Sequence, residues 1–444
     1  MLIRLVALAA LFGFLFGFDE GVIAGALPFI TKLFGITAAG EGMVTSAVPL
    51  GAVAGAILAA IWADALGRRM VLIICSLLFG IGALASGLAS GEVVLVVARL
   101  MLGIAIGASA LAAPMFLAEL APARQRGAVV SAFQLMITIG ILVSYLIDMM
   151  LEPLGAWRWM LALGAVPAIV TLGGIWFAPE SPRWLVMRGR NEEAETVIAA
   201  VQPELGREAA AEIVRDIAAS QASAPKSADW SQFLSERMRP IASFAIIAFL
   251  LQQVSGINAV IYYAPTILGH AGFDGASTQL AATVGIGIVN VLMTVVAMFI
   301  VDRLGRRPLF IIGFLGAAAS LAVIALTMNS GNPEMAPVAL VGLFVYIAFF
   351  AVSLGPLPWI YMSELFPLSM RSRGMAMASV ANWGCNFLVV FLFPVVVAAA
   401  GAAVTFAIFC GFCVLGAIYA WARAPETKGA SLEDLEKRGL AVTA

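Results

Sequence analysis

Apolar residues gather in runs that are long enough to cross a membrane. A helix needs about 20 mainly apolar residues to cross a hydrocarbon core of about 30 Å. Such runs occupy residues 5–29, 41–63, 70–90, 93–120, 127–150, 157–178, 240–269, 276–301, 308–329, 336–364, 372–400 and 402–423. The pattern predicts an all-α membrane protein with twelve transmembrane helices in two sets of six. The first run is too long for a signal peptide and contains acids, so we interpret it as a spanning helix.

A polar stretch separates the two sets of runs. It has helical periodicity and good helix formers, and its middle is rich in Ala, Ser and Pro. We therefore expect a first six-helix bundle over 1–180, a cytoplasmic helical linker over 181–239, a second bundle over 240–424 and a cytoplasmic tail over 425–444.

Composition supports the membrane assignment and narrows the chemistry. The chain has 444 residues, of which 62% are hydrophobic and 11% charged, with a mean hydropathy of +1.02. The net charge is −1 and no basic block suggests nucleic acid. The single histidine is His270, and the four cysteines lie in apolar runs without metal-ligand spacing. We expect no metal site, no cofactor and no enzyme activity.

The distribution of Lys and Arg predicts the orientation, because cytoplasmic loops retain basic residues. Most basic clusters fall between helices on one side, together with the linker and the tail, whereas the other side holds only Lys32 and Arg158. We therefore expect a multi-pass protein of the cell (inner) membrane with both termini in the cytoplasm.

The two halves repeat each other. "DALGRR" at 64–69 returns as "DRLGRR" at 302–307, and "AELAPARQRG" at 118–127 returns as "SELFPLSMRSRG" at 363–374. Two related six-helix bundles that meet at a midplane site are a transporter architecture.

The repeated charges predict a cytoplasmic network. A simple surface ion pair would contribute about 0–1 kcal/mol, and a topology anchor would need only one copy. Duplication at matching places favours control of conformation. The predicted members are Asp64, Arg68, Arg69, Glu119, Arg126, Glu180, Arg183, Asp302, Arg306, Arg307, Glu364, Arg371 and Glu426.

Further motifs carry a family resemblance. Together with both "GRR" copies, "PESPRWL" at 179–185, "QQVSGIN" at 252–258 and "PETKG" at 425–429 resemble the sugar porter family of the major facilitator superfamily. The resemblance implies the major facilitator fold, in which two bundles rock around a central sugar site without ATP hydrolysis or covalent change to the sugar.

Sugar recognition needs polar groups for hydroxyls and flat apolar surfaces for the C–H faces of the ring. Carboxamides at membrane depth are costly unless they are used. By similarity to the family, the sugar-binding positions are Gln134, Gln252, Gln253, Asn258 and Asn290, with Trp359 as an aromatic near the sugar. Asn382 is a further candidate, and Trp383 is interpreted as a packing residue. Hydrogen bonds between helices are the alternative use of these amides.

Two segments are candidates for gates. The resemblance suggests that Tyr262 and Tyr263 belong to an extracellular gate, and that a break of the tenth helix at Gly355, Pro356 and Pro358 belongs to a cytoplasmic one. An aromatic belt and a static kink are the alternatives.

The first run carries two adjacent acids, Asp19 and Glu20. An acid inside a spanning helix indicates function, and Arg99 in the fourth run is the candidate partner. Asp19 and Arg99 resemble the pair found in proton-coupled sugar porters, in which an acid at the position of Asp19 carries the proton and pairs with an arginine of the fourth helix. Neighbouring helix positions face different ways, so we expect Glu20 to point away from this pair.

These observations predict import of a monosaccharide together with protons, across a lipid bilayer, by a monomer that works by alternating access. The alternatives are a facilitator of the same fold, with Asp19 and Arg99 structural, and a membrane sugar sensor. Glucose, xylose, galactose and polyols all stay open as substrates, because they differ by single groups.

Overall fold

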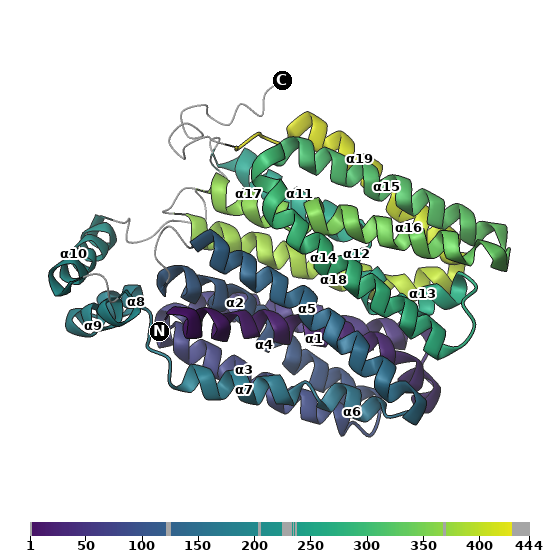
Figure 1. The fold of residues 1–444 in the computed structure, drawn as a ribbon, viewed down its shortest axis with the longest axis horizontal. Coiled ribbons are helices and arrows are strands. Elements are labelled where there is room, and N and C mark those ends of the chain that lie inside the picture. Colours follow the sequence, from purple (N-terminus) through teal and green to yellow (C-terminus); the bar gives the residue numbers. More distant parts are fainter. Residues whose placement is uncertain are drawn as a thin grey trace.

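Two groups of membrane-length helices lie side by side, and the short helices of the linker lie at one end of them (Figure 1). The computed structural model describes residues 2–120, 126–202, 206–223, 233, 235, 238–366 and 370–428. Among these residues, twelve stretches are long and apolar enough to cross a membrane, which confirms the number predicted.

The first bundle holds the helices before the linker. They are α1 (Leu2–Phe34), α2 (Ala38–Leu66), α3 (Arg68–Gly87), α4 (Glu92–Leu120), α5 (Arg126–Leu151), the 3₁₀ turn η2 (Glu152–Leu154), α6 (Trp157–Ala162) and α7 (Ala165–Trp176). The sixth apolar run is thus divided into α6 and α7 at Leu163 and Gly164.

The linker forms α8 (Pro182–Met187), α9 (Asn191–Val201) and α10 (Arg207–Ser223). A small core of its own holds these helices together, with Leu185, Ile198 and Val214 among its buried members. The start of α1 and the end of α19 lie at this same end of the molecule (Figure 1). We call it the linker end, and the opposite end of the bundles the far end.

The second bundle holds the remaining elements. They are α11 (Arg239–Val254), α12 (Ile257–Tyr262), α13 (Ala264–His270), α14 (Ala276–Leu304), α15 (Arg306–Ser330), the 3₁₀ turn η4 (Pro333–Met335), α16 (Ala336–Phe349), the π-helical turn η5 (Phe350–Leu354), α17 (Leu357–Leu365), α18 (Arg371–Ala400) and α19 (Ala402–Arg423). Across the two bundles, α5 packs against α14, and α2 packs against α18.

The seventh apolar run, expected as one helix over 240–269, is broken twice. Gly256 adopts a left-handed φ of 90°, which ends α11 and lets α12 begin at Ile257. A Cβ atom at this position would lie 2.4 Å from a ring carbon of Phe409. Glycine is therefore required both by the turn and by the packing.

Close contact between α1 and α5 depends on a glycine at every fourth position of α1. Cβ atoms built on Gly13 and Gly17 would lie 2.4 and 1.8 Å from the carbonyl oxygens of Phe133 and Ile137. Small residues with this spacing allow helix backbones to approach closely within a membrane. This contact places the middle of α1, including its two acids, inside the bundle.

Candidate functional site

The acid and the arginine expected to pair do meet inside the first bundle. Asp19 on α1 and Arg99 on α4 are 3% and 1% exposed, and Asp19 Oδ1 lies 3.7 Å from Arg99 Nη1. Arg99 Nε donates to the Val44 carbonyl of α2 at 2.9 Å. A tight charged hydrogen bond would measure about 2.7–2.9 Å, so the pair is held by charge more than by a shared proton.

Glu20 faces the other bundle. Its side chain is 5% exposed, and its Oε1 accepts a hydrogen bond from the Tyr262 hydroxyl of α12 at 3.1 Å. The turn of the helix separates Glu20 from the Asp19–Arg99 pair, as helix geometry predicts. No pattern around Glu20 indicated that the Tyr262 phenol would be its partner.

A third buried acid was missed by the sequence analysis. Asp148 on α5 is fully buried, and its Oδ2 accepts a hydrogen bond from the Gly25 backbone N–H at 3.1 Å. The sequence did contain an indication of this site, because an acid inside an apolar run indicates function at Asp148 as it does at Asp19.

Three of the predicted amides form a continuous chain of hydrogen bonds. Asn258 Nδ2 donates to Gln253 Oε1 at 2.8 Å, and Gln253 Nε2 donates to Asn382 Oδ1 at 2.6 Å. The three side chains come from α12, α11 and α18 and are 5–7% exposed. Such a chain fixes the direction of each amide, which leaves defined donor and acceptor positions for a polyhydroxylated ligand.

Gln252 connects the amides to the break in the tenth span. Pro358 has no N–H to donate to the carbonyl of Leu354 four residues before it. Gln252 Nε2 donates to that carbonyl at 2.7 Å and to the carbonyl of Gly355 at 3.1 Å. Its Oε1 is buried without a hydrogen-bond partner among the described atoms, so it has an acceptor to offer. Pro356 directly follows the two contacted residues and precedes α17.

The other predicted sugar residues come from several helices. Asn290 on α14 is buried, and Gln134 on α5 is half-buried. The half-buried Trp359 packs edge-on against Phe249, with ring centroids 4.7 Å apart. No hydrogen bond joins these residues to the amide chain in the described part of the protein.

Trp383 both packs between the two bundles and has a buried indole N–H without a partner among the described atoms. Its ring packs on Phe16 of α1, 5.4 Å between centroids, and therefore joins the two bundles. Its indole N–H and the side-chain carbonyl oxygen of Asn386, one turn later on α18, are buried without partners in the described structure. Both atoms are available to a ligand, a feature that a packing interpretation does not include.

The two tyrosines expected at a gate are buried toward the far end. Tyr262 donates to Glu20, whereas Tyr263 donates to the Val390 carbonyl of α18 at 3.1 Å. Beside them, the Tyr145 hydroxyl of α5 donates to the Ile261 carbonyl at 2.8 Å. Hydrogen bonds of Tyr262 and Tyr145 thus hold the two bundles together on this side.

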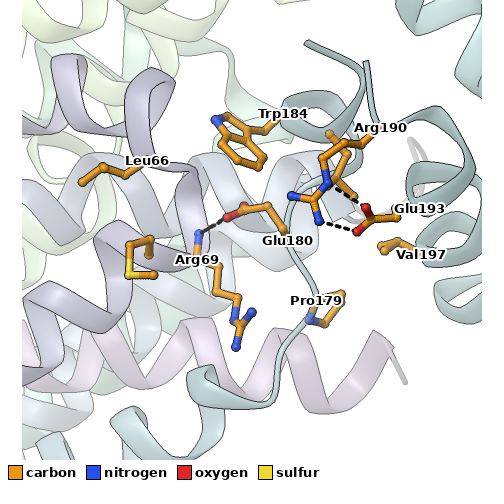
Figure 2. Close-up of a pocket in the computed structure, with 10 residues that line it drawn as sticks. Leu66, Arg69, Pro179, Glu180, Trp184, Arg190, Glu193 and Val197 are labelled. Atoms are coloured by element: carbon orange, nitrogen blue, oxygen red, sulfur yellow. Dashed lines mark hydrogen bonds and ion pairs between the residues drawn. The ribbon is translucent and has the colours of Figure 1, made fainter. Parts of the chain in front are cut away.

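At the linker end, the first charge cluster, which we call the first latch, joins α2, α3, α4 and the segment before α8. Glu180 accepts the backbone N–H groups of Arg68 and Arg69 at 3.0 and 3.1 Å, which caps α3. Figure 2 shows the contact with Arg69. Arg68 Nε lies 3.1 Å from Glu119 Oε2, and its Nη1 lies 3.4 Å from Asp64 Oδ1. Burial raises the pKa of Glu180, although these N–H donors and Arg68 oppose the rise.

The second latch repeats this arrangement in the other bundle. Glu426 accepts the backbone N–H groups of Arg306 and Arg307 at 3.0 and 3.1 Å, and Arg306 Nη2 lies 2.9 Å from Glu364 Oε1. Partial burial acts to raise the pKa of Glu426, but its N–H donors and Arg306 outweigh burial and lower it. Thr427 donates to Glu364 as Ser181 donates to Glu119 in the first latch.

The remaining predicted members of the network differ in their contacts and exposure. Arg69 donates to the carbonyl oxygens of Ile175 and Trp176 at the end of α7, and Arg307 donates to that of Trp421 in α19. Arg183 lies exposed on α8. The side chains of Arg126, Asp302 and Arg371 lie outside the described residues.

Comparison with known proteins places this architecture in a family. The family model described as "Sugar (and other) transporter" matches residues 5–438. The galactose-proton symporter of Escherichia coli is 39% identical over 97% of this chain and 92% of its own. A D-xylose transporter of Levilactobacillus brevis is 38% identical over 96% of this chain and 93% of its own.

Among solved structures, the xylose transporter XylE from E. coli in a partially occluded inward-open conformation superposes with a TM-score of 0.86. It is 29% identical, and the alignment covers 97% of this chain and 99% of XylE. The chain belongs to the sugar transporter family of the major facilitator superfamily.

Proposed function

We propose that this protein imports a monosaccharide together with a proton by alternating access. The observation that carries the proposal is the buried Asp19–Arg99 pair, which lies on membrane-length helices, as the buried amides Gln253 and Asn382 do. A buried carboxylate without a tight hydrogen bond changes its charge readily when its surroundings change. Relatives whose names specify proton symport of galactose and transport of xylose support the same conclusion.

Asp19 is the proton carrier in this mechanism. Ionised Asp19 is attracted to Arg99, and its protonation removes that attraction and releases α1 from α4. Coupling requires that the sugar bind with different affinity to the two protonation states.

The sugar is bound by the amide chain Asn258–Gln253–Asn382, by Gln252, and by Gln134, Asn290 and Trp359 from neighbouring helices. Trp383 and Asn386 add an unpaired donor and acceptor. Because Gln252 holds the carbonyls of the tenth-span break, a hydroxyl that competes for Gln252 loosens α16 from α17. This links sugar binding to the gate at Gly355, Pro356 and Pro358.

The two latches stabilise the state in which each bundle holds its linker-end charges together. The latches contain basic residues of the clusters whose distribution predicts the cytoplasmic side. The linker end therefore faces the cytoplasm, and the far end faces outside. Both termini are then cytoplasmic, in the inner membrane of a bacterial-type cell, and the transporter acts as a monomer.

The test is uptake of labelled glucose, xylose and galactose into proteoliposomes, with and without an inward proton gradient. Wild type should accumulate its sugar above equilibrium, and Asp19→Asn should lose accumulation while sugar exchange survives. Glu334→Gln, at an exposed acid of the far-end turn η4, is the matched control and should behave as wild type. Equilibration that ignores the gradient in all three proteins would make this a facilitator.

A further inference from the structure

Glu20 forms a contact that must break whenever the far end opens. Its carboxyl group lies on α1 of the first bundle, and the Tyr262 hydroxyl that donates to it, at 3.1 Å, lies on α12 of the second. The side chain of Glu20 is 5% exposed and that of Tyr262 is 1% exposed. Separation of α1 from α12 would therefore break the hydrogen bond and admit water to Glu20.

The charges around Glu20 do not neutralise it. Arg99 of α4 contacts other groups: its Nη1 lies 3.7 Å from Asp19 Oδ1, and its Nε donates to the Val44 carbonyl. From α5, the Tyr145 hydroxyl donates to the Ile261 carbonyl and Asp148 accepts from the Gly25 N–H, so neither residue brings a positive charge. Asp19, beside Glu20 in the chain, adds a like charge when ionised.

The other helices packed on α1 do not bring a counter-charge to Glu20: α2 and α7 contain no basic residue, and His270 at the end of α13 is exposed. Tyr263, at the end of α12, donates to the Val390 carbonyl. Arg158 of α6 donates to the carbonyl oxygens of Gly87 and Ala89 near the far end. Glu20 is therefore a buried acid whose described partner is a neutral phenol.

Burial without a counter-charge favours the neutral form of a carboxyl group, whereas contact with water favours the ion. Closing the far end removes water from Glu20, so the closed state must bind a proton there more tightly than the open state. By linkage, a proton on Glu20 favours closure to the same extent.

We propose that Glu20 is a second protonation site, separate from Asp19, which takes a proton from water on the far side and thereby permits Tyr262 to close over it. The neutral carboxyl group still accepts the Tyr262 hydrogen bond through its carbonyl oxygen. When the far end reopens, Glu20 returns the proton to the same side. The proton on Glu20 thus sets the closing equilibrium and adds nothing to the number of protons transported.

The proposal rests on alternating access by the proposed sugar transporter, and its test separates the two. Sugar exchange is measured at equal pH on both sides of proteoliposomes, from acidic to alkaline pH, so that no gradient contributes. The comparison uses an Asp19→Asn background, which removes the carrier, with and without Glu20→Gln. We expect exchange by Asp19→Asn to fall at least severalfold at alkaline pH, and exchange by the double variant to stay level.

Two further variants sharpen the result. Tyr262→Phe in the Asp19→Asn background keeps the acid and should keep the alkaline fall, and Glu20→Asp should do the same. Identical pH profiles with and without Glu20→Gln would overturn the proposal.

A second measurement does not require transport. Infrared difference spectra of the purified protein, between acidic and alkaline buffer, report the C=O stretch of each carboxylic acid that titrates. Glu20→Gln should remove one band that Asp19→Asn leaves in place. An unchanged spectrum would overturn the proposal even if no sugar were transported, whereas failure of gradient-driven uptake alone would count only against the proposed function.

Discussion

At the scale of single residues, the amide side chains differ in which of their hydrogen-bonding atoms the protein itself uses. Gln253 both donates to Asn382 and accepts from Asn258, so it fixes the orientation of both. Gln252 donates through Nε2 to the backbone, and its Oε1 has no hydrogen-bond partner among the described atoms. Hydrogen bonding between helices, the alternative use of membrane amides, is thus present in the same side chains that we propose bind the sugar.

Gln253→Ala should therefore weaken sugar binding. Loss of hydrogen bonds between neutral groups costs about 0.5–1.5 kcal/mol each, so we expect the Kd for sugar to rise about tenfold. The measurement is isothermal titration of the purified protein with the transported sugar. Gln279→Ala removes an amide that donates to the Phe273 carbonyl near the far end, and an equal loss of affinity there would contradict the assignment.

At the scale of helices, the sequence predicted the spans well because length and apolar character are local properties. The breaks were harder to predict. The break at Gly256 depends on the ring of Phe409, which is far away in the chain. The partner of Glu20 lies 242 residues away, and an adjacent acid gives no indication of which helix will face it. The prolines of the tenth span were visible, whereas the amide that satisfies the freed carbonyl was not.

The contact between α2 and α18 predicts a variant that is trapped. A Cβ atom on Gly42 of α2 would lie 2.3 Å from the Phe391 carbonyl oxygen of α18, so no side chain fits there while the far end is closed. Gly42→Trp should hold the far end open, abolish uptake and retain sugar binding. Uptake and titration of the same preparation test this. Gly411→Trp, on an exposed face of α19 with open space around it, should transport normally.

The two latches should respond differently to acid. The pKa of Glu426 lies below its ordinary value of 4.5, so its contribution to stability is complete above pH 4.5 and is lost as pH falls through the lowered pKa. The pKa of Glu180 lies above 4.5, so its contribution is complete below pH 4.5 and is lost as pH rises through the raised pKa.

We therefore expect Glu426→Gln to reduce the fall in Tm on acidification, and Glu180→Gln to reduce the fall in Tm as pH rises above 4.5. Thermal unfolding followed by intrinsic fluorescence across the pH range measures both. If the Tm of both variants depended on pH as the Tm of the wild type does, the two capping carboxylates would not be the groups whose titration changes stability.

At the scale of the whole molecule, the structure presents a transporter whose bundles touch near the far end. The Ser277 hydroxyl of α14 donates to Glu152 of η2, directly after α5, at 2.8 Å, in addition to the tyrosine contacts. The solved structure with a TM-score of 0.86 is described as a partially occluded inward-open conformation of XylE, and with the orientation that we propose, contact at the far end agrees with it.

A cross-link at this point should stop the cycle. With cysteines at positions 152 and 277, a short bis-maleimide should join the bundles at the far end and reduce sugar uptake to background. Each single cysteine variant, treated in the same way, should keep its uptake. Uptake that survives complete cross-linking, judged by the mass of a proteolysed sample, would mean that the far end does not open during transport.

The caps of α3 and α15 have a consequence for how mutational scans of this protein are interpreted. Glu180 and Glu426 bind main-chain N–H groups, and every residue except proline supplies one. Replacing the arginine side chains at 68, 69, 306 or 307 would leave these bonds intact. A scan that substitutes only those arginines would therefore record half of each latch, and the other half would become visible only when the two glutamates are changed.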